Sequence, residues 1–202
     1  MRRYVSRRKG IPFRSKSVLE VDNKKPDCGL CSAAQRFCIF AMICNLCPRR
    51  CGADRSTPQG LKRSICRATD DVEIALVSLH AWEEPILESG NGAGTVFFSH
   101  CNLRCCFCQN YEISAGGKGL KVTTARLTDI FLEEAERGAS CIELVTPGNY
   151  TRQIREALLS AKAQGLKLPV VYNSNAYELP ETLRMLDGLV DIFLPDLKYF
   201  DS

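Results

Sequence analysis

A chain of 202 residues that is 45% hydrophobic can bury a core, which excludes disorder throughout. The net charge of +4 is uneven, because residues 1–25 hold nine Lys or Arg against two acidic residues and the remainder is net acidic. This basic segment lacks the aromatic interleaving typical of base stacking, and no segment approaches the roughly 20 apolar residues of a membrane helix. We therefore expect residues 1–27 to be a disordered tail, the protein to be cytoplasmic, and neither nucleic acid nor a membrane to be a partner.

Residues 28–90 are rich in cysteine and irregular in pattern. Seven of the twelve cysteines lie between positions 28 and 66, and in the absence of a signal peptide they favour metal or redox chemistry over disulfides. "CNLCPRRCG", with turns at Pro48 and Gly52, and the later Cys66 predict a closed four-ligand site. Its ligands are Cys44, Cys47, Cys51 and Cys66.

Thiolates alone do not separate tetrahedral zinc from an auxiliary iron-sulfur cluster at that site. A competing arrangement, a zinc ribbon, pairs Cys28-x-x-Cys31 with Cys44-x-x-Cys47. In either case we expect residues 28–90 to form a separate metal-binding region.

From residue 95 onward, short apolar runs alternate with segments of helical period, which is typical of repeated βα units and a parallel sheet. Gly138, Gly165 and Gly188 supply the helix stops. The predicted strands are residues 95–98, 141–145, 169–172 and 190–194, and the predicted helices begin near residues 124, 151 and 180.

Four such strands do not close an eight-stranded barrel, and no segment remains to cover the last strand. We therefore expect an α/β fold in which residues 91–202 form a partial parallel (βα) barrel that is truncated after its fourth strand. An open doubly wound sheet is the alternative.

The segment "SHCNLRCCFCQNYE" directly follows the first predicted strand, in a loop where parallel α/β folds bind ligands. Cys101, Cys105 and Cys108 keep the spacing CxxxCxxC, a poor closed zinc site because zinc knuckles come as two separated pairs. Three thiolates instead suit a four-iron four-sulfur cluster with one iron left open. We expect the adjacent Cys106 to pack or to face solvent.

This CxxxCxΦC spacing, with Phe107 as the aromatic residue, resembles the signature of the radical S-adenosylmethionine (radical SAM) enzymes. The chain is further similar to the branch related to pyruvate formate-lyase activating enzyme. That similarity lies in "LCPRRCG", "FFSHCNLRCCFCQN", "VVYNSNAYE" and "DIFLPDLKYFD". The resemblance covers most of the chain from about residue 44, and family members usually continue further, which agrees with a fragment.

The resemblance implies that SAM is held by residues that follow the predicted strands. Asp196 and Lys198 project to the same side because their spacing is two, and they match an Asp-x-Lys that helps to hold SAM. Asn173 and Ser174 stand where relatives have Asp-Thr-Asn-Gly, although Asn173 is an amide where their residue is acidic.

After the second strand, relatives have a Gly-Gly-Glu-like segment that contacts the amino group of SAM. This chain has Thr146-Pro147-Gly148-Asn149 there, so no carboxylate is present in that segment. A backbone carbonyl or the Thr146 hydroxyl would accept the hydrogen bonds instead. His100, in place of a small residue, either tunes the cluster or packs.

The expected function is that of a radical SAM oxidoreductase that generates a 5'-deoxyadenosyl radical for hydrogen abstraction, with activation of a glycyl-radical enzyme as one route. The expected cofactors are a four-iron four-sulfur cluster and SAM, with zinc or a second cluster at the other cysteines. Expected partners are an electron donor such as flavodoxin or ferredoxin and a protein substrate. The alternatives are a zinc-binding interaction module and a ferredoxin-like electron carrier.

Overall fold

The computed structural model describes residues 43–81 and 91–198. Residues 41–202 form one compact unit, and the description below concerns that unit alone. The predicted basic tail, residues 1–27, and the competing zinc ribbon with Cys28 and Cys31 lie outside the described residues. The predicted boundary at residues 90 and 91 adjoins the segment 82–90, which also lies outside them.

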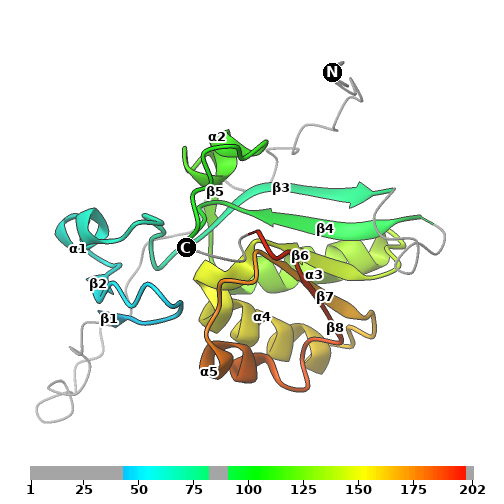
Figure 1. Cartoon of the computed structure of the whole chain (residues 1–202). Helices are drawn as coiled ribbons and strands as arrows, with labels where there is room; N and C mark the ends of the chain where they lie inside the picture. The colour runs from blue at the N-terminus through cyan, green and yellow to red at the C-terminus, as the bar shows by residue number, and fades with distance from the viewer. Residues whose placement is uncertain (1–42, 82–90, 199–202) are drawn as a thin grey trace, which may run out of the picture. The chain divides into compact units, whose positions relative to one another are not determined.

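The centre of the unit is a six-stranded sheet with strand order β5-β3-β4-β6-β7-β8 (Figure 1). Four neighbouring strands run parallel to one another: β4 (Ala93–Phe98), β6 (Ile142–Val145), β7 (Val170–Ser174) and β8 (Ile192–Pro195). β3 (Val72–His80) pairs antiparallel with β4 and with the short β5 (Leu120–Val122). The protein is thus a mixed α/β fold with a mostly parallel sheet.

Two amphipathic helices connect the parallel strands, as the βα pattern predicts. α3 (Thr124–Glu136) is capped by the Thr123 hydroxyl, which accepts from the backbone N–H of Arg126, and α4 (Thr151–Ala163) follows the short 3-10 helix η2 (Pro147–Tyr150). The last connection is shorter: α5 (Pro180–Leu183) and η3 (Arg184–Leu186).

The main core lies between these helices and one face of the sheet, where alternate strand residues point toward the helices. Its fully buried members include Ile142 and Leu144 of β6, Phe131 of α3, and Ile154 and Leu158 of α4. Gly94, on the same face of β4 as the core residues Val96 and Phe98, approaches α3 so closely that a Cβ there would lie 2.8 Å from the Glu134 Cβ. Strand and helix therefore pack with little space between them.

The segment between residues 43 and 67 is made of small elements. β1 (Ile43–Cys44) and β2 (Ala53–Asp54) form an antiparallel pair, and α1 (Pro58–Arg63) is capped by the Thr57 hydroxyl. A further one-turn helix, α2 (Tyr111–Ser114), follows the cysteine loop after β4.

The four predicted parallel strands and the three helices are confirmed: the strand bounds differ by at most two residues, and the helices begin at residues 124, 151 and 180 as predicted. The prediction of an irregular region before residue 91 is wrong for Val72–His80, a nine-residue strand of the central sheet. Antiparallel pairing with β4 and β5 stabilises it, so part of the cysteine-rich region belongs to the core sheet.

Candidate functional site

The loops that follow the four parallel strands meet at one edge of the sheet, because parallel strands present their carboxyl ends together. The loop after β4 carries the cysteine triad, the loops after β6 and β7 begin at Thr146 and Asn175, and Asp196 follows β8. The fold therefore brings the predicted site residues between positions 95 and 198 to the same edge of the sheet.

Two of the triad sulfurs accept hydrogen bonds from neighbouring side chains. The Asn175 Nδ2 donates to the Cys101 Sγ at 3.3 Å, and the Ser114 Oγ donates to the Cys108 Sγ at 3.2 Å. Cys101 is buried and Cys105 and Cys108 are partly buried, whereas Cys106 is exposed, which confirms that Cys106 faces solvent. Phe107 is 65% exposed.

Within residues 43–81 and 91–198, no three His, Cys, Asp or Glu side chains are gathered in an arrangement that could hold a metal ion. The donor set nevertheless fits an iron-sulfur cluster in its chemistry: three free thiols on one loop, two of which already accept hydrogen bonds of the kind that stabilises thiolates.

The second cysteine group lies on the hairpin of β1 and β2 and on the loop after α1. Cys44 is buried, and Cys47, Cys51 and Cys66 are partly buried free thiols. The expected turns are present, since the Arg50 N–H donates to the Cys47 carbonyl at 3.0 Å and Gly52 has a φ of 61°. Burial, aided by the nearby Cys44 and Cys66 thiols, raises the pKa of Cys47.

The two cysteine groups are joined through polar contacts. The Arg49 guanidinium donates to the backbone carbonyls of Asn102 and Leu103, and the Arg104 Nη1 donates to the Ile65 carbonyl at 3.0 Å. The segment that carries the second group thus packs directly on the triad loop.

His100 is a further link between the two groups. Its ring nitrogens lie 3.1 Å from the Cys66 carbonyl and 3.1 Å from the Glu73 carboxylate, and its side chain is about 10% exposed. It also has a φ of 71°, and a Cβ on Gly117 would lie 2.6 Å from its ring. His100 is therefore packed; whether it also tunes a cluster stays a prediction.

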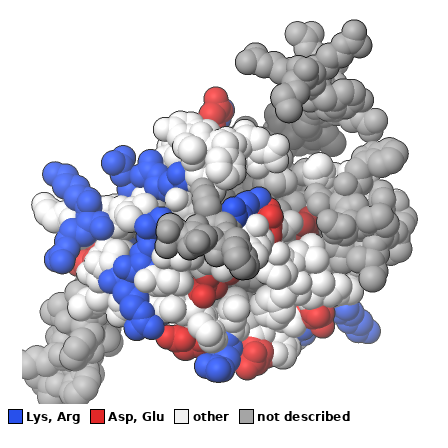
Figure 2. All heavy atoms as spheres, in the orientation of Figure 1, with Lys and Arg blue, Asp and Glu red and all other residues white. Residues whose placement is uncertain are grey.

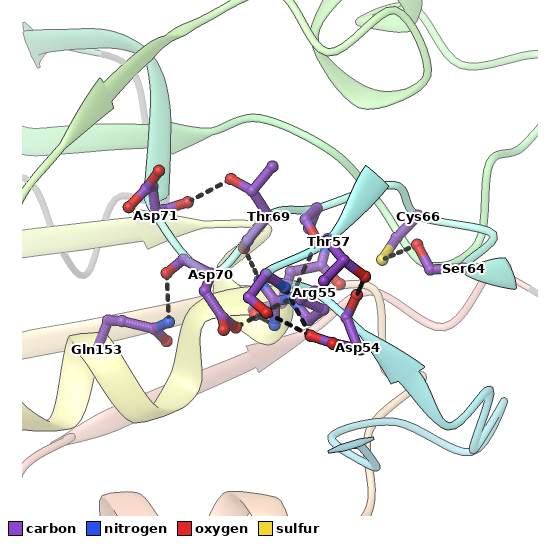
Figure 3. A network of polar contacts seen from close by, with 12 residues as sticks. Asp54, Arg55, Thr57, Ser64, Cys66, Thr69, Asp70, Asp71 and Gln153 are labelled. Carbon is purple, nitrogen blue, oxygen red and sulfur yellow. Dashed lines mark hydrogen bonds and ion pairs between the residues drawn. The ribbon is translucent and has the colours of Figure 1, made fainter. Parts of the chain in front are cut away.

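Arg55 fastens the cysteine-rich segment to the sheet (Figure 3). This buried side chain donates to the carbonyls of Ala68, Thr69 and Asn149, lies 3.8 Å from the Asp70 carboxylate, and stacks over the Tyr150 ring at 5.4 Å. Because Asn149 belongs to the loop after β6, one guanidinium connects the hairpin with the parallel sheet.

Residues at the ends of β6 and β7 form two separate groups. The Asn173 Nδ2 donates to the buried Glu143 at 2.9 Å, and Glu143 also accepts from the Thr95 hydroxyl at 3.0 Å. The side chain of Asn173 is therefore hydrogen-bonded to a neighbouring strand of the sheet. In the second group, the Ser174 Oγ donates to Glu178 at 3.0 Å.

Thr146, at the end of β6, has a φ of 56°, a left-handed conformation that is costly for a β-branched residue. Its N–H donates to the Asn173 carbonyl at 2.9 Å. Such strain persists only where the surrounding contacts impose it, so the loops after β6 and β7 are fixed against each other.

Asp196 and Lys198 form an ion pair with each other after β8, which confirms that they project to the same side. The Asp196 N–H donates to the Ser174 carbonyl at 2.8 Å. Contact of either side chain with a ligand stays a prediction.

Sequence reasoning did not single out four residues that the structure places at this edge: Asn102, Asn149, Glu143 and Glu178. Asn102 lies inside the CxxxCxxC segment but is not a cluster ligand type, and Asn149 lies in the Thr146–Asn149 segment without a role of its own there. For Glu143 and Glu178, only their position within or after a predicted strand was available as a signal.

Comparison with known proteins gives one distant similarity. An uncharacterized protein of Methanocaldococcus jannaschii is 28% identical over 163 residues, which covers 77% of this chain and 45% of that protein. The chain thus spans less than half the length of this relative. No protein-family model and no solved structure matches the chain. None of the described helices is long and apolar enough to cross a membrane.

Proposed function

We propose that this chain is the core of a radical SAM oxidoreductase of the branch related to pyruvate formate-lyase activating enzyme. The observation that carries the proposal is the CxxxCxxC loop, with Cys101, Cys105 and Cys108, placed after the first of four parallel strands. Cofactors of α/β folds bind at this edge, and the loops after β6, β7 and β8 lie beside it.

The three thiolates would hold a four-iron four-sulfur cluster. When bound, such a cluster supplies an open iron that chelates SAM and the electron that cleaves it to a 5'-deoxyadenosyl radical for hydrogen abstraction. Ser114 and Asn175 stabilise the ligating thiolates through their hydrogen bonds to sulfur. Residues proposed to contact SAM are Phe107, Thr146, Gly148, Asn173, Ser174, Asp196 and Lys198.

The second cysteine group would hold zinc or an auxiliary cluster, and its contacts with the triad loop support a structural link between the two metals. The proposed partners are an acidic electron donor of the flavodoxin or ferredoxin kind and a protein substrate, such as an enzyme whose glycine is converted to a radical.

The proposal is tested by electron paramagnetic resonance of the anaerobically reconstituted, reduced protein, with and without SAM. A variant with Cys44→Ala and Cys47→Ala silences the second site. We expect a reduced-cluster signal that SAM alters. Cys105→Ala should abolish the signal, whereas Cys106→Ala should leave it intact, because Cys106 is exposed and adjacent but not a proposed ligand.

The alternatives predict different results in the same experiment. A ferredoxin-like carrier gives a cluster signal that SAM does not change. A zinc-binding module loads zinc but no iron, remains colourless and gives no signal. Either outcome contradicts the radical SAM proposal.

A further inference from the structure

The loop that carries the triad has a strained backbone at two points. His100, directly before Cys101, has a φ of 71°, and Arg104, directly before Cys105, has a φ of 55°. Both residues lie in the left-handed region, which is unfavourable for side chains other than glycine. Strain of this kind persists only where surrounding contacts impose it. The contacts of these two residues therefore help to decide whether the triad loop keeps its conformation.

Each of the two strained residues contacts the segment of the second cysteine group. The Arg104 Nη1 donates to the Ile65 carbonyl at 3.0 Å, and the His100 Nδ1 lies 3.1 Å from the carbonyl of Cys66, the next residue. Cys66 is itself one of the four proposed ligands of the second site. A metal that fixes Cys66 would therefore also fix the acceptors that these two side chains use.

Arg49 forms a third link, and it joins the two cysteine spacings directly. It lies between two proposed ligands of the second site, in "CPRRC", and its guanidinium donates to the carbonyls of Asn102 and Leu103, between the first two cysteines of the triad. The same guanidinium lies 5.5 Å from the centre of the Tyr177 ring, in the loop after β7. Among the described residues no carboxylate forms an ion pair with Arg49, so its hydrogen bonds there are directed at the triad loop.

The Asn102 side chain extends this link to one sulfur of each cysteine group. It hydrogen-bonds with the Cys47 thiol, and its Oδ1 accepts from the Asn175 Nδ2 at 2.7 Å. The same Asn175 Nδ2 contacts the Cys101 Sγ at 3.3 Å. Asn102 is 4% exposed, so little water competes for these hydrogen bonds. Two side-chain amides therefore connect a thiol of the second group with a thiol of the triad.

We propose that a metal at the second cysteine group stabilises the cluster held by the triad, and that Arg49 is the positioning residue that transmits this effect. The inference rests on the proposed function, which assigns a metal to each group. Among the described residues the thiols are not gathered as in a metal site, so metal binding must order the hairpin of β1 and β2 that carries most of the second group. Arg49 then holds the carbonyls of the triad loop in place. The cluster still forms without the second metal, but it is lost faster.

The test measures how fast the anaerobically reconstituted full chain loses its triad cluster to an iron chelator. The triad cluster is followed as the part of the reduced electron paramagnetic resonance signal that Cys105→Ala removes. Cys51→Ala, which removes a ligand of the second site, and Arg49→Gln should each speed the loss by about 5- to 30-fold, as expected when one or two buried hydrogen bonds are lost. The double variant should be no faster than the faster single variant, because both changes break the same link.

Arg50→Gln is the matched control. Arg50 lies in the same turn but is exposed and pairs with Glu181 at 3.2 Å, so its replacement should leave the rate of cluster loss unchanged. Arg49→Lys should give an intermediate rate, since an ammonium lacks the planar fork that reaches two carbonyls. If Arg49 serves only to hold the fold, its variant unfolds more easily but multiplies its effect with that of Cys51→Ala instead of sharing it.

A measurement on the wild type keeps the test decisive if the variants fold poorly. The wild type is loaded with iron and sulfide for one cluster per chain, with or without one prior equivalent of zinc. Zinc at the second group should slow the loss of the triad signal by the same 5- to 30-fold factor. A rate that zinc does not change overturns the inference, and so does a triad signal that zinc diminishes, because zinc would then prefer the triad.

Failure of the inference and failure of the proposed function give different results. If the wild type has a triad signal that SAM alters, but neither zinc nor Arg49→Gln changes the rate of cluster loss, the role of Arg49 is overturned and the radical SAM proposal stands. If the wild type forms no cluster that depends on Cys105, the proposed function itself fails.

Discussion

At the scale of single residues, the partly buried carboxyl group of Glu178 affects stability. Burial raises its carboxyl pKa, so the folded protein holds the Glu178 proton more tightly than the unfolded chain does. As pH rises above the ordinary carboxyl pKa, the unfolded state ionises first and the free energy of unfolding falls. The wild type is therefore less stable at neutral pH than it would be with a neutral side chain at this position.

We expect Glu178→Gln to raise the melting temperature of the SAM-free protein at pH 7 to 8, and the difference from the wild type to shrink as the pH is lowered toward 4. The neighbouring Tyr172 phenol does not titrate in this range, because burial raises its pKa as well. Thermal unfolding followed by circular dichroism across this pH range measures the effect.

Glu181→Gln provides the comparison, since Glu181 is exposed and should show little change. A variant at position 178 that is less stable than the wild type at pH 7 would mean that the Glu178 carboxylate is already well compensated in the free protein.

The residues that could be predicted from the sequence are those whose chemistry depends on spacing along the chain. Cys101, Cys105 and Cys108 share one loop, and their spacing alone predicts a common set of ligands, although the described structure does not gather their three side chains in an arrangement that could hold a metal ion. Glu178 and Asn149 line one depression because β6 and β7, whose following loops carry them, are adjacent in the sheet. The burial of Glu178 and the unpaired amide of Asn149 depend on this tertiary packing, which a sequence does not record.

At the scale of secondary-structure elements, Arg55 fixes the hairpin of β1 and β2 to the sheet. Its guanidinium is the donor for three backbone carbonyls, and its side chain is 4% exposed. Removal of this donor leaves buried acceptors without partners, and each such group costs about 1–3 kcal/mol.

We expect Arg55→Met to lower the free energy of unfolding by about 3–5 kcal/mol, as is typical when one partner of a buried charged network is removed. Arg55→Lys should recover only part of this loss, because an ammonium lacks the planar fork that reaches several carbonyls. Urea unfolding at constant protein concentration provides the measurement.

Arg50→Met is the matched control, since Arg50 is exposed and pairs with Glu181 at 3.2 Å; its effect should stay within about 0.5 kcal/mol. Equal effects at positions 50 and 55 would show that the hairpin is held by other contacts.

The local sequence pattern of each element explains which helices and strands could be predicted. α3 and α4 have long apolar faces bounded by cap and stop residues, and β4, β6, β7 and β8 are apolar runs between them. β3 was missed although Val72–His80 is apolar, because its place depends on antiparallel pairing with β4 across the segment 82–90. β5 has only three residues, which is too short for any periodicity.

At the scale of the whole described unit, charge is concentrated near the cysteine groups. Residues 43–67 contain six Lys or Arg and one acidic residue, and Arg50, Lys62, Arg63 and Arg67 are exposed. Figure 2 shows Lys and Arg side chains gathered on the side of the unit where Figure 1 places α1. Because this segment packs on the triad loop, an acidic electron donor attracted here would dock close to the proposed cluster.

The proposed function therefore predicts that the rate of cluster reduction by a flavodoxin falls as ionic strength rises. We expect a decrease of about tenfold or more between 0.05 and 0.5 M salt, since screening shortens the reach of surface charge. Lys62→Gln with Arg63→Gln should slow reduction at low salt, have little effect at high salt, and leave iron content unchanged. Stopped-flow absorbance of the cluster measures these rates.

Arg155→Gln with Lys167→Gln removes two exposed positive charges from α4 and the loop after it, which are distant in sequence from either cysteine group. If this pair slows reduction as much as the pair on α1 does, the attraction reflects net charge alone and no particular surface guides the donor. If only the α1 pair has an effect, the basic segment around the second cysteine group is the docking surface. In that case Arg49 and Arg104 would have a second role. The contacts by which these side chains join the two cysteine groups would also hold the docking surface against the triad loop.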